Sequence, residues 1–220
     1  MLYPFKVVLF NGAAGITLAI ESNPLLPYGH KVRLIGLSYY LMFDNMTKGN
    51  WDKGLDYEKT KKLLMQRLKE LRLVFGIRSG RALAYTCALL TQLRNGSRVS
   101  EAVDAVRLWV TQKKREVEVR VRKHRKPEMR KMIIPEELKE EDRLRVLPFL
   151  NYLTPSNVKV YAKSSLGFNT HSLRYARITH LARKGVSPSL IAKITHHKRL
   201  DYILHYTEQK AADEINRQIT

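Results

Sequence analysis

The chain has 220 residues, and 40 Lys and Arg against 20 Asp and Glu give it a formal net charge of +20 and a pI near 10.1. Hydrophobic residues make up 44% of the sequence, which excludes a disordered basic tail and suffices for one large domain, or a small domain with an extension. The basic excess favours a polyanionic partner, and nucleic acid, an acidic membrane surface and a ribosomal role all fit the charge alone.

Cysteine content and hydropathy indicate a soluble intracellular protein. Cys87 is the only cysteine, so no intrachain disulfide can form, and its apolar surroundings predict a buried side chain rather than a nucleophile. The apolar stretch at 7–20 is interrupted by Asn11 and Gly12 and is a poor signal peptide. The apolar run at 34–43 is too short to span a bilayer.

Helical periodicity begins near Tyr57, after an apolar N-terminal segment with several turn signals. One face of the first helix is predicted from a spacing of i, i+4, i+7 and i+11: Leu64, Leu68, Leu71 and Phe75. A second helix is expected over 81–93. Ser100 is a good N-cap for a third helix that runs to about Val110.

The period then changes to two, because Val117, Val119 and Val121 alternate with charged residues. Residues 132–135 read as the returning strand of a hairpin. Helices follow at 136–146, after the Thr154-Pro155 N-terminal signal, and at 173–184. Ser187-Pro188 begins another helix, and a short amphipathic helix closes the chain. The expected fold is mainly α with a small antiparallel β-hairpin.

The most specific signal lies in the last third. His171-Ser172-Leu173-Arg174 places an imidazole and a guanidinium one helical turn apart on one face. His197 follows, and Tyr206 stands nine residues after it, while Arg98 precedes Val-Ser-Glu upstream. A tyrosine oxygen can cut a phosphodiester without metal if guanidinium groups hold the non-bridging oxygens and imidazoles move the protons.

This set of residues resembles the signature of the tyrosine recombinase (phage-integrase) family, and the similarity covers about residues 85–220. The matching positions, in order and approximate spacing, are Arg98, His171, Arg174, His197 and Tyr206. The resemblance implies a tyrosine-recombinase-like catalytic domain over 59–220. Residues 1–58 would then be an N-terminal extension or a reduced core-binding segment.

The resemblance also implies roles. Tyr206 attacks the scissile phosphate to give a 3′-phosphotyrosyl bond, and Arg98 and Arg174 clamp its oxygens. His171 helps to accept the tyrosine proton, and His197 donates a hydrogen bond to the phosphate. Glu101 either holds a group of the site in place or is simply a favourable acid in the first turn of a helix.

A lysine on the hairpin would protonate the leaving 5′-oxygen; Lys123 fits this place best, and Lys126 is its rival. The usual Gly before the second histidine is replaced by His196, which is the alternative to His197. Tyr202 lies close to Tyr206, but the spacing from His197 selects Tyr206.

The implied partner is double-stranded DNA, with a homotetramer on DNA and a monomer or weak oligomer without it. Phosphate contacts are expected from basic residues in and around the hairpin: Lys113, Lys114, Arg120, Arg122, Arg125, Lys126 and Arg130. No cofactor, metal or membrane is expected. The implied location is the cytoplasm, associated with the nucleoid, or the host cytoplasm if the chain is of viral or plasmid origin.

Two alternatives share parts of the pattern. A type IB topoisomerase uses the same phosphotyrosine chemistry. Residues 181–191 resemble a helix-turn-helix, so a DNA-binding protein without catalysis is the second alternative. Three imidazoles within ten residues, His196, His197 and His205, raise the question of zinc, but no other ligand spacing supports it.

Overall fold

The structure is a computed structural model that describes residues 7–12, 15–20, 54–121, 128–197 and Asn216. The chain divides into two compact units, Met1–Asp44 and Asn45–Thr220. In the first unit, strands β1 (Val7–Gly12) and β2 (Gly15–Ile20) form an antiparallel hairpin. The domain boundary expected after residue 58 stays a prediction.

Helix α1 (Tyr57–Leu73) begins the helical part of the second unit. Phe75 was predicted on its buried face, and this prediction is wrong, because the helix ends at Leu73 and the Phe75 side chain is 81% exposed. The rest of the predicted face is confirmed by three buried leucines: Leu64, Leu68 and Leu71.

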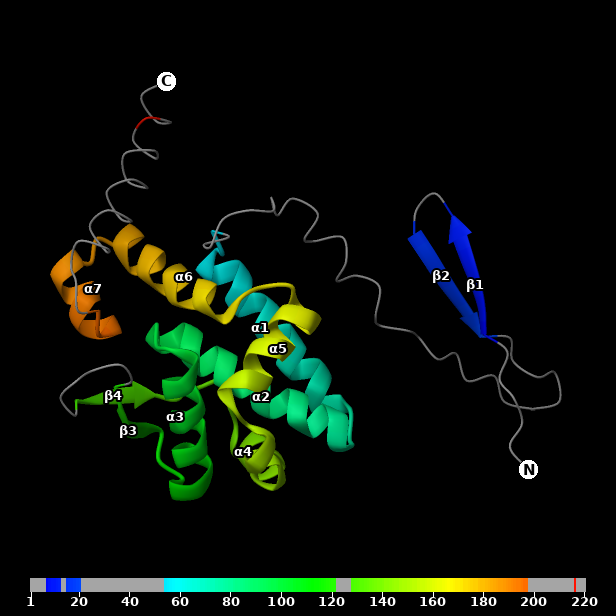
Figure 1. Ribbon diagram of the computed structural model, residues 1–220, viewed down its shortest axis with the longest axis horizontal. Coiled ribbons are helices and arrows are strands. Elements are labelled where there is room, and N and C mark those ends of the chain that lie inside the picture. Colours follow the sequence, from blue (N-terminus) through cyan, green and yellow to red (C-terminus); the bar gives the residue numbers. More distant parts are fainter. Residues whose placement is uncertain (1–6, 13–14, 21–53, 122–127, 198–215, 217–220) are drawn as a thin grey trace. The chain divides into compact units, whose positions relative to one another are not determined.

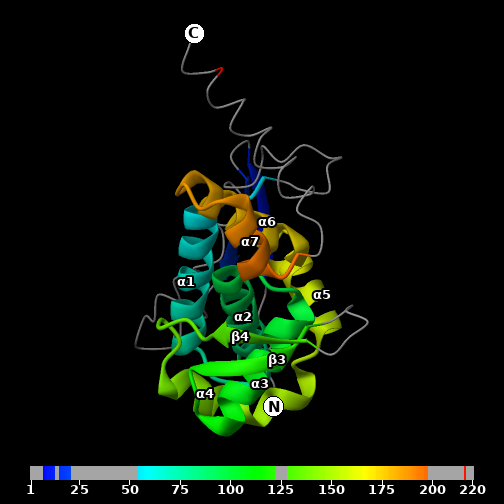
Figure 2. The same cartoon turned by 90° about the vertical axis from the view of Figure 1, so that its left-hand side faces the viewer.

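Helix α2 (Ile77–Asn95) forms the centre of this unit and is longer at both ends than the predicted helix. It contacts α1 on one side and α3, α5 and α6 on others, and the two views show these helices around it (Figures 1 and 2). Its apolar run is buried in the main core, and Cys87 has no exposed surface, as predicted. Burial raises the pKa of the Cys87 thiol, which keeps it protonated.

Helix α3 (Val99–Gln112) begins one residue before Ser100, so the predicted N-cap is wrong. Arg98 occupies the N-cap position with an extended backbone, and its amide donates to Glu101 Oε2 at 3.1 Å. The carboxylate three residues into the helix therefore satisfies the amide that precedes it.

The expected hairpin is confirmed by strands β3 (Glu116–Arg120) and β4 (Met129–Ile133), which pair antiparallel. Inward positions alternate with exposed ones along both strands, as the period of two requires. The Asn95 side chain covers the free edge of β4, since its amide donates to Ile133 O at 2.8 Å and its oxygen accepts from Ile133 N at 2.9 Å.

Helix α4 (Glu140–Val146) is shorter than the predicted helix, because residues 135–139 form a turn. The 3₁₀-helix η2 (Leu147–Tyr152) continues from it, and α5 (Pro155–Leu166) has the predicted Thr154 N-cap. Within the described residues the second unit is thus mostly helical with a small antiparallel sheet, which confirms the expected class.

Helices α6 (Thr170–Arg183) and α7 (Pro188–Thr195) close the described part of this unit. Helix α6 starts three residues before the predicted start, so His171 and Arg174 both lie in its first turns. Gly185 has a positive φ of 76° and turns the chain after the helix, as predicted. No helix among the described residues is both long and apolar enough to cross a membrane.

An ion pair with a buried carboxylate joins helix α1 to helix α4. Asp142 on α4 accepts from Arg72 Nε at 2.9 Å and from Arg72 Nη2 at 2.6 Å, and also from the Lys139 amide at 2.8 Å. The Asp142 side chain is 1% exposed and that of Arg72 is 22% exposed. The pair therefore fixes the end of α1 against the start of α4.

Replacing Asp142 by Ala should lower the free energy of unfolding by about 3 kcal/mol, the lower end of the cost of breaking a buried pair, because Arg72 still reaches solvent. The measurement is urea unfolding followed by circular dichroism. Glu141→Ala is the matched control, since its side chain is exposed and its loss should change the free energy by less than about 0.5 kcal/mol. Equal effects of the two substitutions would contradict the assignment.

Candidate active site

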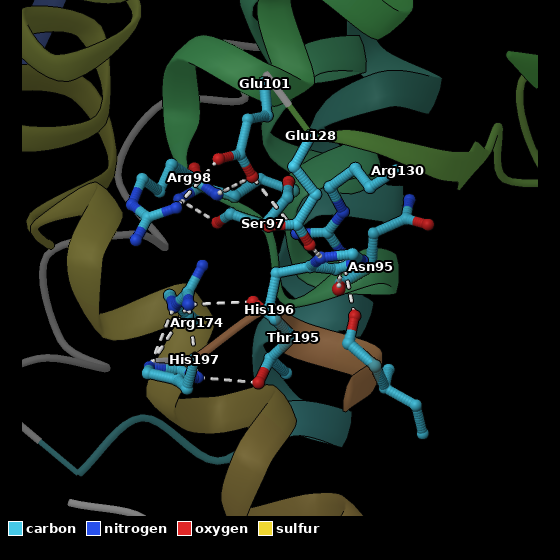
Figure 3. Close-up of polar contacts among 12 residues, drawn as sticks. Asn95, Ser97, Arg98, Glu101, Glu128, Arg130, Arg174, Thr195, His196 and His197 are labelled. Atoms are coloured by element: carbon cyan, nitrogen blue, oxygen red, sulfur yellow. Dashed lines mark hydrogen bonds and ion pairs between the residues drawn. The ribbon is translucent and has the colours of Figure 1, made fainter. Parts of the chain in front are cut away.

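The site is built around Glu101, in the first turn of α3, whose side chain is fully buried. Its Oε1 accepts from Arg98 Nη1 at 3.0 Å, and its Oε2 accepts from Arg130 Nη1 at 3.1 Å (Figure 3). Burial alone would raise the pKa of Glu101, but the Arg98 hydrogen bonds and the Arg130 charge bring it below its usual value. Glu101 is therefore a carboxylate at neutral pH, fixed between two guanidinium groups.

Arg98 is the more accessible of these two arginines, with 27% of its side chain exposed. Its loop is positioned by Gln92, whose amide donates to Ser97 O at 3.2 Å and to Thr170 O at 2.8 Å. Because Thr170 begins α6, this one side chain ties the Arg98 loop to the helix that carries His171 and Arg174. Sequence reasoning had not singled out Gln92.

Gly96 allows the same loop to approach α6 and α7 closely. Its φ is +57°, and a Cβ built on it would lie 3.0 Å from Thr195 Cγ2 and 3.1 Å from Arg177 Cγ. A left-handed backbone in so small a space favours glycine at this position. The turn before Arg98 therefore packs directly on the residues that border Arg174.

Arg174 is 2% exposed and reaches the turn at the end of α7. Its Nη2 donates to Thr195 O at 2.8 Å, and its Nε donates to His197 Nε2 at 3.2 Å. Its Nη1 is buried and has no hydrogen-bond partner among the described residues. Burial, and next the charge of Arg98, lower the pKa of Arg174 to about 10, so it stays protonated at neutral pH.

His197 lies against Arg174 in the neutral state. Thr195 Oγ1 donates to Ile191 O at 2.7 Å, so its oxygen is left to accept from His197 Nδ1, 2.6 Å away. With Nδ1 as the donor to Thr195, Nε2 accepts from Arg174 Nε, while Arg174 Nη2 lies 3.1 Å from Nδ1 and 3.2 Å from Nε2, so the guanidinium contacts both ring nitrogens. Burial, followed by the charges of Arg174 and Arg98, lowers the pKa of His197 to about 3.

The side chains of the adjacent residues His196 and His197 contact different partners. His196 has a left-handed backbone with φ of 53°, and its Nδ1 lies 2.6 Å from Glu128 Oε1, just before β4. His197, and not His196, contacts Arg174, as Figure 3 shows. The two imidazoles, Glu128 and neighbouring residues of α7 line a hollow of about 380 Å³.

His171 lies in the first turn of α6 with an exposed side chain, and the Asn169 Oδ1 caps its amide at 3.0 Å. Its ring meets Tyr175 edge to face, with 4.8 Å between centroids. It is close enough to His197 for its charge to contribute to the lowered pKa of that ring. The structure thus gathers Arg98, His171, Arg174 and His197 in one region.

The other expected site residues fall into two groups. Lys113, Lys114 and Arg120 are exposed at the end of α3 and on β3. The remaining ones lie outside the described residues: Arg122, Lys123, Arg125, Lys126, Tyr206 and the alternative Tyr202.

Arg130 differs from the role expected of it. It was grouped with the surface residues that contact DNA, but it is 3% exposed and its guanidinium is bound inside the protein. The signal was present in the sequence: counting back by two from Ile134 and Met132, both buried, places Arg130 on the inward face of the strand.

No group of three or more His, Cys, Asp or Glu side chains within the described ranges is arranged to hold a metal ion. The positive groups of the site are arginines: Arg98 and Arg130 both bind the Glu101 carboxylate, and the charge of Glu101 also acts on Arg174. That arrangement carries a net positive charge and fits an anion whose size and geometry suit a guanidinium fork.

A comparison with known proteins finds relatives of this chain. The chain is 38% identical over 173 residues to a putative integrase of the Acidianus two-tailed virus, which covers 78% of this chain and 70% of that protein. It is 34% identical over 202 residues to an uncharacterised protein of Methanocaldococcus jannaschii, covering 78% and 89%. It is 28% identical over 199 residues to a putative integrase of the Sputnik virophage, covering 75% and 88%.

These relatives show that the chain belongs to an integrase family. No family model matches the chain, and no solved structure matches it.

His197 should stay neutral in the free protein to well below pH 5, because the folded state holds its pKa near 3. The unfolded chain binds a proton near the ordinary histidine pKa of about 6.5, so folding stability should decrease as pH falls from about 6.5 toward 3. Ring nitrogen NMR shifts of the histidines measure this directly. A His197 titration near pH 6.5 would contradict the prediction.

Proposed function

We propose that this chain is an integrase of the tyrosine-recombinase type, which cuts and rejoins double-stranded DNA through a 3′-phosphotyrosyl bond to Tyr206. One observation carries the proposal: Arg98 and Arg174, 76 positions apart in the chain, are brought together with His197 by the fold. The putative integrases among the relatives support DNA as the substrate.

The arginine pair suits a phosphodiester. Arg174 Nη1 is buried without a partner among the described residues, and an unpaired donor on a buried cation is costly. A non-bridging phosphate oxygen would satisfy it, while the partly exposed Arg98 takes the other oxygen. Both side chains are held by contacts to Glu101 or Thr195, so little reorganisation is needed as charge develops in the transition state.

The chemical step follows from these positions. Tyr206 Oη attacks phosphorus, its proton passes to His171, and the bond from phosphorus to the 5′-oxygen breaks. Lys123, or its rival Lys126, gives a proton to that leaving oxygen. The phosphodiester is replaced by a phosphotyrosyl ester of similar energy, so attack by a 5′-hydroxyl reverses the step without ATP.

His197 would change its protonation during this cycle. In the described geometry its Nε2 accepts from Arg174, so the neutral ring cannot donate from that nitrogen. A phosphate between the arginines offsets the positive charges that lower the pKa of His197. The ring then gains a proton and donates a hydrogen bond to the phosphate. Strand exchange between two duplexes needs four such sites, so we propose a tetramer on DNA.

Tyr206→Phe should abolish covalent adducts while leaving DNA binding almost unchanged, because only the nucleophilic hydroxyl is removed. The probe is a pool of nicked duplexes with randomised sequence, in which the short cleaved strand diffuses away and traps the adduct, run in EDTA and read on a denaturing gel. Tyr202→Phe is the matched control and should form adducts at the wild-type level. Adducts with Tyr206→Phe, or none with the wild-type chain, would overturn the proposal.

Lys123→Ala should slow cleavage by about 100-fold, within the range for loss of a general acid. A duplex with a 5′-bridging phosphorothiolate should restore most of the rate, since a thiolate leaves without a proton. Lys126→Ala is the comparison. If the sulfur substrate rescues Lys126→Ala and not Lys123→Ala, the general acid is Lys126.

A further inference from the structure

Arg130 is a buried guanidinium, and not one of the exposed phosphate contacts among which the sequence placed it. It lies on β4 opposite Val119 and points inward beside the core residue Met132. A buried guanidinium is costly unless it is paired. Both terminal nitrogens of Arg130 have partners, while its Nε has none among the described residues. The partners of the terminal nitrogens indicate which elements Arg130 holds together.

Three partners of Arg130 lie on three different elements. Its Nη1 donates to Glu101 Oε2 at 3.1 Å, and its Nη2 donates to Asn95 O at 3.0 Å and to Ile194 O at 3.0 Å. Figure 3 shows the guanidinium between Glu101 and Asn95. It thus joins the start of α3, the end of α2 and the end of α7.

Each of these contacts leads to a residue of the site. Glu101 holds the Arg98 guanidinium. Ile194 directly precedes the Thr195–His197 turn, whose carbonyl and imidazole contact Arg174. Arg130 therefore connects the support of one phosphate-binding arginine to the support of the other, through one rigid planar group.

The hairpin makes a second contact with the same turn. Glu128, two residues before Arg130, pairs with His196. The start of β4 is thereby fixed to the end of α7 at two positions, Ile194 and His196. These contacts help to fix the position of the hairpin, and the expected general-acid lysines follow β3 on this hairpin.

We propose that Arg130 is a positioning residue that sets the separation between the Arg98 and Arg174 guanidinium groups, so that both hold one phosphate. This inference rests on the proposed function. Its physical basis is that bidentate binding tolerates little error, and a misplacement of about 1 Å costs on the order of 100-fold in rate. Lysine cannot replace it fully, because its donors do not form a planar fork.

The test compares Arg130→Met with Arg130→Lys in single-turnover cleavage of duplexes recovered from the nicked pool. Arg130→Met should cleave about 100-fold more slowly while its Kd for the same DNA changes less than about threefold. Arg130→Lys keeps the charge beside Glu101 and should fall between. Lys131→Met is the matched control, because Lys131 is the next residue of β4 with a side chain 65% exposed, and it should cleave at the wild-type rate.

A double substitution separates positioning from general stability. In an Arg98→Lys background, adding Arg130→Met should slow cleavage by less than about threefold. Without the Arg98 guanidinium, the separation that Arg130 sets between the two guanidinium groups no longer affects the rate. If the role of Arg130 is purely structural, adding Arg130→Met should reduce the cleavage rate by the same factor as in the otherwise wild-type chain. All rates are taken below the unfolding temperature of each variant, and if Arg130→Met does not fold, Arg130→Lys decides the question.

The outcomes distinguish this inference from the proposed function. No adduct from the wild-type chain overturns the proposed function and the inference with it. Wild-type cleavage together with an unimpaired Arg130→Met or Arg130→Lys, or with losses that multiply in the Arg98→Lys background, overturns the inference alone.

Discussion

The rest of the site depends on one buried carboxylate. Glu101 has no exposed surface, yet it stays ionised because Arg98 and Arg130 both donate to it. Without it, three arginines would lie near one another with no compensating charge, because Glu101 opposes the lowering of the pKa of Arg130 and Arg174 that burial and the charge of Arg98 cause. With it, the cluster is stable enough to exist before any anion binds and still carries a net positive charge.

Short polar links bring the parts of that cluster together from distant segments. Gln92 joins the Arg98 loop to the start of α6, and Asn95 covers the edge of β4 as another strand would. Gly96 lets the loop between them approach Thr195. The last turn of α2 therefore acts as the common frame for α3, α6, α7 and the hairpin, and each link satisfies a backbone group that would otherwise be unpaired.

The same geometry bears on how an integrase of this family could be controlled by its substrate. Arg174 and His197 satisfy one another in the described structure, so the imidazole is neutral and turned toward a cation. A phosphate would break this pairing and supply the negative charge that the imidazole needs in order to protonate. In the proposed function, the protonated state of His197 would then form only when DNA is bound.

The sequence by itself determined the mainly helical class, the hairpin and the buried leucines of α1, and it singled out Arg98, His171, Arg174 and His197, whose roles at the site stay predictions. Those depend on local periodicity, capping and spacing, which the chain carries in its order. Tertiary structure decided that His197 rather than His196 meets Arg174, since a left-handed turn sends the two rings apart. It also ended α1 before Phe75 and gave the inward-facing Arg130 its partners Glu101, Asn95 and Ile194. These partners come from distant segments, and no local pattern identifies them.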